Sequence, residues 1–181
     1  MAELKPCSPC AGMLPVVVGS TRLEETDPGR LTLLAPFDGQ QNAFSVALKA
    51  AHGVRYPLPN ATETNGATQI IWFGRDSALL MGPEPDSTLG TWAAITNQSD
   101  AWACVELSGD AATDVLARLV PVDLRPEHFS AGQTLRCVLG HMNASITYRE
   151  ADRFLLLVYR SMAVTLVEEM KEAMEAVAAR R

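Results

Sequence analysis

The predicted order of secondary-structure elements is the same in both halves of the chain, and this repetition constrains the fold more than any single motif. From Leu31 onward, apolar runs, helical spacings and turn residues predict strand, helix, strand, strand and helix, and the same order starts again at Trp102. Two such units predict a duplicated α+β fold in which helices pack on antiparallel sheets. We therefore expect a loosely ordered leader at 1–30, a first βαββα half at 31–97 and a second at 98–181, with the halves forming one compact unit.

The first half contains short, clearly bounded segments. RLTLLAP is a predicted strand that ends at Pro36, and a helix is expected from Gln40 to His52 with Asp38 as its N-cap and Gly53 as its C-cap. ATQIIWFG and SALLMGP predict a hairpin, after a turn-rich connection. A short helix from Thr88 to Ile95 is expected to close this half.

The second half begins with the predicted strand WACVELSG. Ser108 or Asp110 is expected to cap a short helix that ends at Pro121. TLRCVLGHMNASITY and RFLLLVYRS follow as two further predicted strands. The last helix is expected from Met162 to Ala179, because its apolar residues recur at intervals of three and four.

Composition and charge exclude several classes of protein. The chain is 48% hydrophobic and 20% charged, which excludes wholesale disorder. A net charge of −6 makes nucleic acids and anionic membrane surfaces poor partners. No apolar run reaches the roughly 18–20 residues of a membrane span, and the N-terminal stretch does not read as a signal peptide. A cytoplasmic location is expected.

The cysteines and histidines do not form a metal-binding pattern. Cys7 and Cys10 make one CxxC pair among prolines, whereas a structural zinc site needs four ligands. Cys104 and Cys137 lie in strand-like apolar runs, where a free thiol is usually a small buried hydrophobe. The three histidines lack ligand spacing: His52, His128 and His141. No glycine-rich phosphate loop is present, which argues against a flavin or nicotinamide site.

His141 is the most conspicuous candidate for a catalytic group. It lies in CVLGHMNASITY without an Asp, Ser or Cys at a spacing that indicates a relay. Gly140 is expected to form a strand bulge or bend that lets the imidazole reach a backbone carbonyl. A structural, hydrogen-bonded histidine is the favoured interpretation, and catalysis is the alternative.

Two further groups have both a binding and a structural interpretation. Asp123 with Arg125 could orient a substrate amine or carboxylate, but an Asp in a loop commonly accepts backbone N–H bonds. Arg160 and Ser161 could hold an anion at a strand-to-helix junction, but Ser161 is equally an ordinary N-cap. The structural interpretation is favoured in each case. We therefore predict no catalytic, cofactor-binding or metal-binding residue on this chain.

The second half resembles the gamma subunit family of heterotetrameric sarcosine oxidase. Three pieces carry the resemblance: LARLVPVDL (116–124) with Phe129 behind it, the Leu139–Met142 step, and Tyr159–Ser161 at the start of the last helix. WFGRDSALLMGP resembles the hairpin in the first half of the family, and coverage runs from about Leu31 to Met174. Ser77 and Ala78 depart from the acidic-aromatic pair usual in that hairpin.

The resemblance implies a fold and a set of partners. The family is related to the folate-binding fold of the glycine-cleavage aminomethyltransferase, a duplicated α+β architecture. Sarcosine oxidase oxidatively demethylates N-methylglycine, and its FAD, FMN, NAD and tetrahydrofolate are expected on the partner subunits, with no cofactor on this chain. Alpha, beta and delta subunits are the implied partners. The implied role of the gamma subunit is structural.

Three functions remain open at this point. The first is a non-catalytic gamma subunit of sarcosine oxidase, or a gamma-like subunit of a related N-methyl amino acid dehydrogenase. The second is a free-standing folate-binding module, and the third is an aminomethyltransferase-like enzyme, which the short chain disfavours. A structural subunit predicts an apolar interface, for which the candidates are Met13–Val18, Trp72, Trp92 and the methionines of the last helix. Such a patch predicts self-association of the isolated chain.

Overall fold

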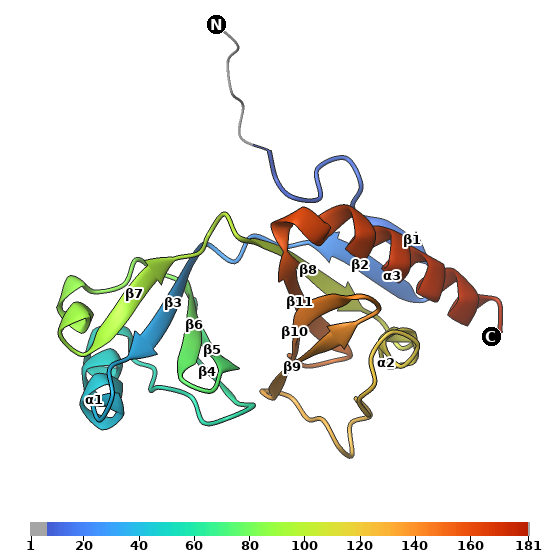
Figure 1. The fold of residues 1–181 in the computed structure, drawn as a ribbon. Coiled ribbons are helices and arrows are strands. Elements are labelled where there is room, and N and C mark those ends of the chain that lie inside the picture. The colour runs from blue at the N-terminus through green and yellow to red at the C-terminus, as the bar shows by residue number, and fades with distance from the viewer. Residues whose placement is uncertain (1–6, 181) are drawn as a thin grey trace, which may run out of the picture.

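Two antiparallel β-sheets, each with helices on its outer face, make up the part of the chain that the computed structural model describes, residues 7–180 (Figure 1). The α+β class predicted from the sequence is confirmed. In spatial order, the N-terminal sheet contains β4 (Thr62–Asn65), β5 (Thr68–Gly74), β6 (Ser77–Gly82), β3 (Arg30–Pro36) and β7 (Ala93–Asn97). The C-terminal sheet contains β1 (Val16–Val18), β2 (Thr21–Glu25), β8 (Trp102–Ser108), β11 (Arg153–Tyr159), β10 (Met142–Tyr148) and β9 (Thr134–Leu139).

The helices are few and cover the outer faces of the sheets. They are α1 (Gln41–His52), α2 (Ala112–Leu116) and α3 (Ala163–Ala178), with 3₁₀ turns η1 (Ser87–Thr91) and η2 (Arg160–Met162). In α3 the buried side chains recur at intervals of three and four, and they include Leu166, Met170 and Met174. Within residues 7–180, none of these helices has both the length and the apolar character needed to cross a membrane.

Three apolar cores lie between the layers of the molecule. One core lies between the C-terminal sheet and the helices α2 and α3, and another lies between the N-terminal sheet and α1. The third joins the two sheets to each other. Its buried side chains are Leu31, Ile71, Phe73, Leu79 and Met81 from the N-terminal sheet, with Trp102, Cys104, Leu155 and Leu157 from the C-terminal sheet. Strands such as β8 are therefore buried on both faces.

The segment 134–148, predicted as one strand, is a hairpin of β9 and β10. Gly140 has φ +55° and stands at the first of the two loop positions, directly before His141. Glycine is favoured there because a type II′ turn needs a positive φ at that position. The sequence predicts only a bulge or bend at Gly140, because a single glycine inside a strand-like segment is also typical of a bulge.

Other local predictions also need correction. The helix expected at Thr88–Ile95 is the short turn η1 followed by β7, and the connection after α1 contains the extra strand β4. Gly53 closes α1 as predicted, with φ 75° and its N–H bonded to the Lys49 carbonyl at 3.0 Å. Asp38, however, does not cap α1, because the N-cap is Gln40 and no side chain bonds there.

The predicted caps of the second half are also wrong. The N-cap of α2 is Ala111, so neither Ser108 nor Asp110 takes that role. The N-cap of α3 is Met162, because Ser161 lies inside the preceding 3₁₀ turn. In each case a short irregular turn leads into the helix, and its N-cap residue makes no side-chain hydrogen bond.

The loosely ordered leader predicted at 1–30 is wrong for the residues that form strands. β2 pairs with β8 through Leu23 and Leu107, and Leu23 is fully buried. Prolines and glycines around these strands suggested irregular chain, yet the strands are stabilised by a distant segment. Residues 1–6 lie outside the described part of the chain.

Candidate functional site

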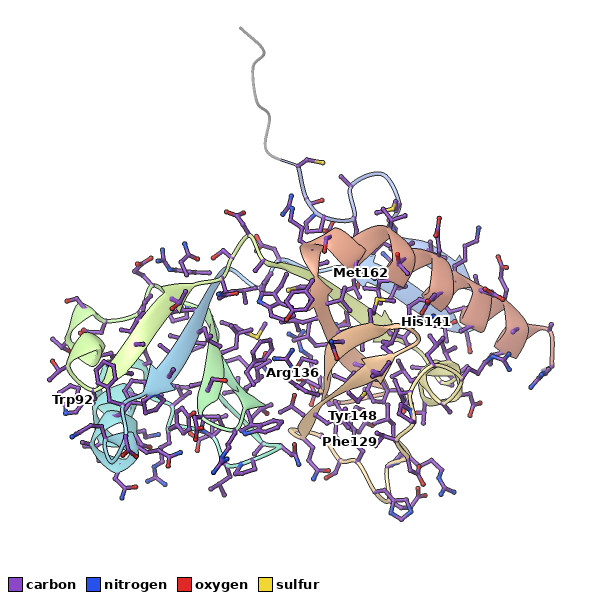
Figure 2. The ribbon with its side chains drawn as sticks, in the orientation of Figure 1. Trp92, Phe129, Arg136, His141, Tyr148 and Met162 are labelled. Carbon is purple, nitrogen blue, oxygen red and sulfur yellow. The ribbon has the colours of Figure 1, made fainter. Side chains whose placement is uncertain are left out.

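Arg136 of β9 extends from the C-terminal sheet to the N-terminal sheet (Figure 2). Its Nη1 donates to the Phe73 carbonyl at 3.0 Å, and its guanidinium carbon lies 4.4 Å from the centre of the Phe73 ring. The same carbon lies 5.6 Å from the Trp102 ring, which stacks on Tyr159 at 4.7 Å. The guanidinium therefore fastens the two sheets through cation–π contacts and a hydrogen bond.

Glu106 is a buried carboxylate with two arginine partners. Its side chain is 4% exposed, and its oxygens accept bonds from Arg149 Nη1 at 3.0 Å and Arg153 Nε at 2.8 Å. These bonds and its charge raise the pKa of Arg153. This carboxylate is hydrogen-bonded on both oxygens by arginines of neighbouring segments, so it serves the structure of the sheet.

The CxxC pair lies in a turn against the C-terminal sheet. Cys7 is exposed and Cys10 is buried, and both thiols are free. Burial and the nearby Glu25 carboxylate raise the pKa of Cys10 to about 11, which keeps the thiol protonated at neutral pH. Burial likewise raises the pKa of Cys104 to about 12. A reactive thiol needs a lowered pKa, so Cys10 and Cys104 are poor nucleophiles.

Within the described residues, no group of three or more His, Cys, Asp or Glu side chains is placed to hold a metal ion. His52 Nε2 accepts a bond from the Asp86 backbone N–H at 3.1 Å. His128 Nε2 lies 3.7 Å from the Asp123 carboxylate on the surface. The three histidines are therefore in separate places.

His141 is on the surface, in the turn between β9 and β10 (Figure 2). Its side chain is 92% exposed, and its Nδ1 lies 3.2 Å from Glu169 Oε1 of α3. The prediction of a bond to a backbone carbonyl is therefore wrong. The contact joins the hairpin to α3, and the Glu169 carboxylate occupies the space beside Gly140 that a Cβ would need.

Asp123 and Arg125 form a closed pair in an exposed loop. Asp123 Oδ1 accepts the Arg125 backbone N–H at 3.1 Å, which is the loop role expected from the sequence. Its carboxylate also accepts the Arg125 side chain at 2.9 Å, and these bonds hold the pKa of Asp123 well below its usual range. The two side chains are therefore each other's hydrogen-bond partners.

A cavity of about 480 Å³ opens where β2 ends. Arg160, Trp102 and Cys104 line it, together with the link at 26–29 that joins the two sheets. The guanidinium of Arg160 donates a hydrogen bond to the Cys7 carbonyl, and its backbone N–H donates one to the Ala101 carbonyl at 2.8 Å. Arg160 therefore ties the N-terminal segment to the C-terminal sheet, and Ser161 does not join it as part of a helix-capping anion site.

The predicted apolar interface is only partly at the surface. Met170 and Met174 face the core and are at most 1% exposed, so the last helix does not offer them to a partner. Val17, inside the predicted segment Met13–Val18, is 61% exposed. Trp72 and Trp92 are partly buried.

Glu106 and Arg136 were missed by the sequence analysis. WACVELSG shows Glu106 in an apolar strand, and that position was the available signal, because a lone acid in such a run needs a cation if it is buried. Arg136 gave no comparable signal, since its ring partners are distant in sequence.

Comparison with known proteins gives consistent results. The model of the family described as "Sarcosine oxidase, gamma subunit family" matches residues 37–175. A sarcosine oxidase subunit gamma from Arthrobacter sp. is 30% identical over 112 residues, which are 56% of this chain and 55% of that protein. The aligned part thus spans about half the length of this relative. A chain of the heterotetrameric sarcosine oxidase from Corynebacterium sp. U-96 has a similar fold, with a TM-score of 0.81 and 22% identity over 96% of each chain.

Proposed function

Because the chain belongs to the sarcosine oxidase gamma subunit family, we propose that it is a non-catalytic structural subunit of a heterotetrameric enzyme that oxidatively demethylates sarcosine. One observation carries the proposal: the polar side chains that were candidates for a site are already paired with other side chains of the chain. Glu106 binds two arginines, Asp123 binds Arg125, and His141 contacts Glu169. Within residues 7–180, these candidates do not converge on one pocket as a general acid, a general base and a nucleophile would.

The proposal extends to the architecture. The N-terminal sheet has the order β4-β5-β6-β3, and the C-terminal sheet has β9-β10-β11-β8, which is the same order with five added to each number. In the N-terminal sheet β7 lies beside β3, and in the C-terminal sheet β2 lies beside β8. This correspondence supports a duplicated unit of the kind found in the folate-binding aminomethyltransferase fold. It also supports two halves, at 31–97 and 98–181, with β1 and β2 from the preceding segment added to the sheet of the second half.

The partners and cofactors follow from the same proposal. Alpha, beta and delta subunits surround the chain in the complex, and FAD, FMN, NAD and tetrahydrofolate bind to them. The gamma chain contributes shape and contact surface, and it works in the cytoplasm. No residue of this chain is assigned to a cofactor or to substrate.

Co-expression of the four chains with and without gamma tests the proposal. We expect the four chains to purify together with sarcosine-dependent oxygen consumption, and the complex without gamma to be unstable or incomplete. Asp123→Asn and His141→Gln in the complex should leave turnover unchanged. Full assembly and turnover without gamma would refute the structural role, and so would stoichiometric flavin or folate on purified gamma.

A further inference from the structure

Strand β7 forms an outer edge of the N-terminal sheet, on the side away from the C-terminal sheet (Figure 1). Among the strands of residues 7–180, it pairs only with β3. No Asp, Glu, Lys or Arg occurs from Ser87 to Ser99, so the whole edge is uncharged. Charged residues, prolines and bulges are the usual means by which proteins prevent an edge from pairing with another strand.

The hydrogen-bond pattern shows which backbone groups of β7 face outward. Phe37 N–H bonds to the Trp92 carbonyl at 2.8 Å, and Gln98 N–H bonds to the Leu31 carbonyl at 2.8 Å. In an antiparallel ladder the bonded pairs alternate, so Ala94 and Thr96 face β3. The N–H and C=O groups of Ala93, Ile95 and Asn97 therefore point away from β3. Within residues 7–180, none of these six groups has a protein partner.

Two of the other sheet edges are already in use. At the β4 edge, Thr62 N–H bonds to the Gly132 carbonyl at 2.9 Å. At the β9 edge, Thr134 N–H bonds to the Asn60 carbonyl at 2.9 Å. These two bonds join the sheets to each other, so the edges of β4 and β9 are partly closed within the molecule.

The edge of β1 is protected in a different way. The strand has only three residues, Val16–Val18, and follows Pro15 directly. A short strand next to proline offers little template for pairing. Among the described strands, β7 thus has an edge of five residues with neither a guard residue nor a hydrogen-bond partner, and because Ala93 is only 1% exposed, the open part of this edge is Ile95 and Asn97.

We propose that β7 receives an extended strand from another subunit of the sarcosine oxidase complex, which adds to the N-terminal sheet. The outward groups of Ile95 and Asn97 require a backbone with the matching alternation of donors and acceptors, which an extended strand supplies. Because the edge is uncharged, the incoming strand is apolar or neutral where it faces β7. This inference rests on the proposed function, which supplies the partner.

Amide hydrogen exchange on the free chain and on the co-expressed complex tests the proposal directly. In the free chain, the amides of Ile95 and Asn97 should exchange quickly, while Ala94 and Thr96 are protected by β3 and Ala93 is buried. In the complex we expect the amides of Ile95 and Asn97 to slow by roughly tenfold or more. Unchanged exchange in an assembled complex would overturn this inference and leave the proposed function intact.

A matched pair of variants gives a second test. Asn97→Pro removes the outward N–H and leaves the β3 ladder intact, because proline is tolerated on an edge strand whose N–H faces outward. Asn97→Ala removes the same side-chain bonds to Ser99 but keeps the N–H. Only the proline variant should weaken association with the other subunits, by roughly tenfold or more, because it blocks at least one hydrogen bond and clashes with the incoming strand.

The remaining outcomes are distinguishable by mass measurement. If β7 pairs with β7 of a second copy, the wild-type chain forms a dimer that Asn97→Pro abolishes, which overturns the assignment to another subunit. Equal association of the two variants also overturns it. If the wild-type chain associates with no other subunit, both the proposed function and this inference fail.

Discussion

Glu106 offers the sharpest test of how the C-terminal sheet is stabilised. We expect Glu106→Gln to lower the free energy of unfolding by about 2–3 kcal/mol. Breaking a fully buried ion pair costs about 3–5 kcal/mol, because an uncompensated charge is left behind. Arg149 and Arg153 are 33% and 49% exposed, so both can turn toward water and part of that cost is avoided. For a chain of this length the loss corresponds to a fall in Tm of about 4–12 °C.

Glu24→Gln is the matched control. Glu24 lies directly opposite Glu106 in the register of β2 and β8, but its side chain is 36% exposed and forms an ion pair with Arg22, which is itself exposed. An exposed pair contributes at most about 1 kcal/mol, and salt screens it. Urea unfolding followed by circular dichroism should therefore separate the two variants at both low and high salt. Equal free energies of unfolding for the two variants would refute the reasoning.

Three further predictions concern the hairpin and the thiols. Gly140→Ala should lower the free energy of unfolding by more than about 1 kcal/mol, because the residue has a positive φ and the new Cβ would overlap the Glu169 carboxylate; Glu169→Ala should recover part of the loss, measured by urea unfolding. His141→Ala should change the same free energy by less than about 0.5 kcal/mol, since the exposed pair contributes little; a loss above 1 kcal/mol would contradict this. Iodoacetamide at pH 8 should label Cys7 and spare Cys10 in the folded chain; because the pKa of Cys10 is raised from 9.0 to about 11, its contribution to stability is present below pH 9 and is lost as the pH rises toward 11.

The elements that sequence predicts well are those whose pattern is local. The helix expected at Met162–Ala179 is found at Ala163–Ala178. It could be predicted because one of its faces is buried, and the apolar residues of that face recur at intervals of three and four. The C-cap at Gly53 is likewise a local signal. Predictions that used a single polar residue as a cap were wrong at Asp38 and Ser161, because short turns supply the entry to those helices.

The contacts that sequence could not predict are those between distant segments. β8 is buried on both faces, so its alternation does not reveal which side chains face the other sheet. The partners of Arg136 and Glu106 come from strands far away in the chain, and no spacing rule connects them. For the same reason β1 and β2 were predicted as irregular chain, although β2 pairs with β8 and β1 pairs with β2.

The pairing of β2 with β8 has a consequence for synthesis of the chain. Leu23 of β2 is made early, while its partner Leu107 is about 80 residues further along, so at about 5–20 residues per second the first strand waits roughly 4–16 seconds for its neighbour. During that interval the edge of β2 that pairs with β8 has no partner, although β1 can already pair with the other edge and the N-terminal sheet can already be complete. Translation speed between Thr26 and Ala101 therefore sets how long this edge of β2 stays unpaired. Codon choice in this stretch is expected to affect the yield of folded protein more than codon choice after Ser108.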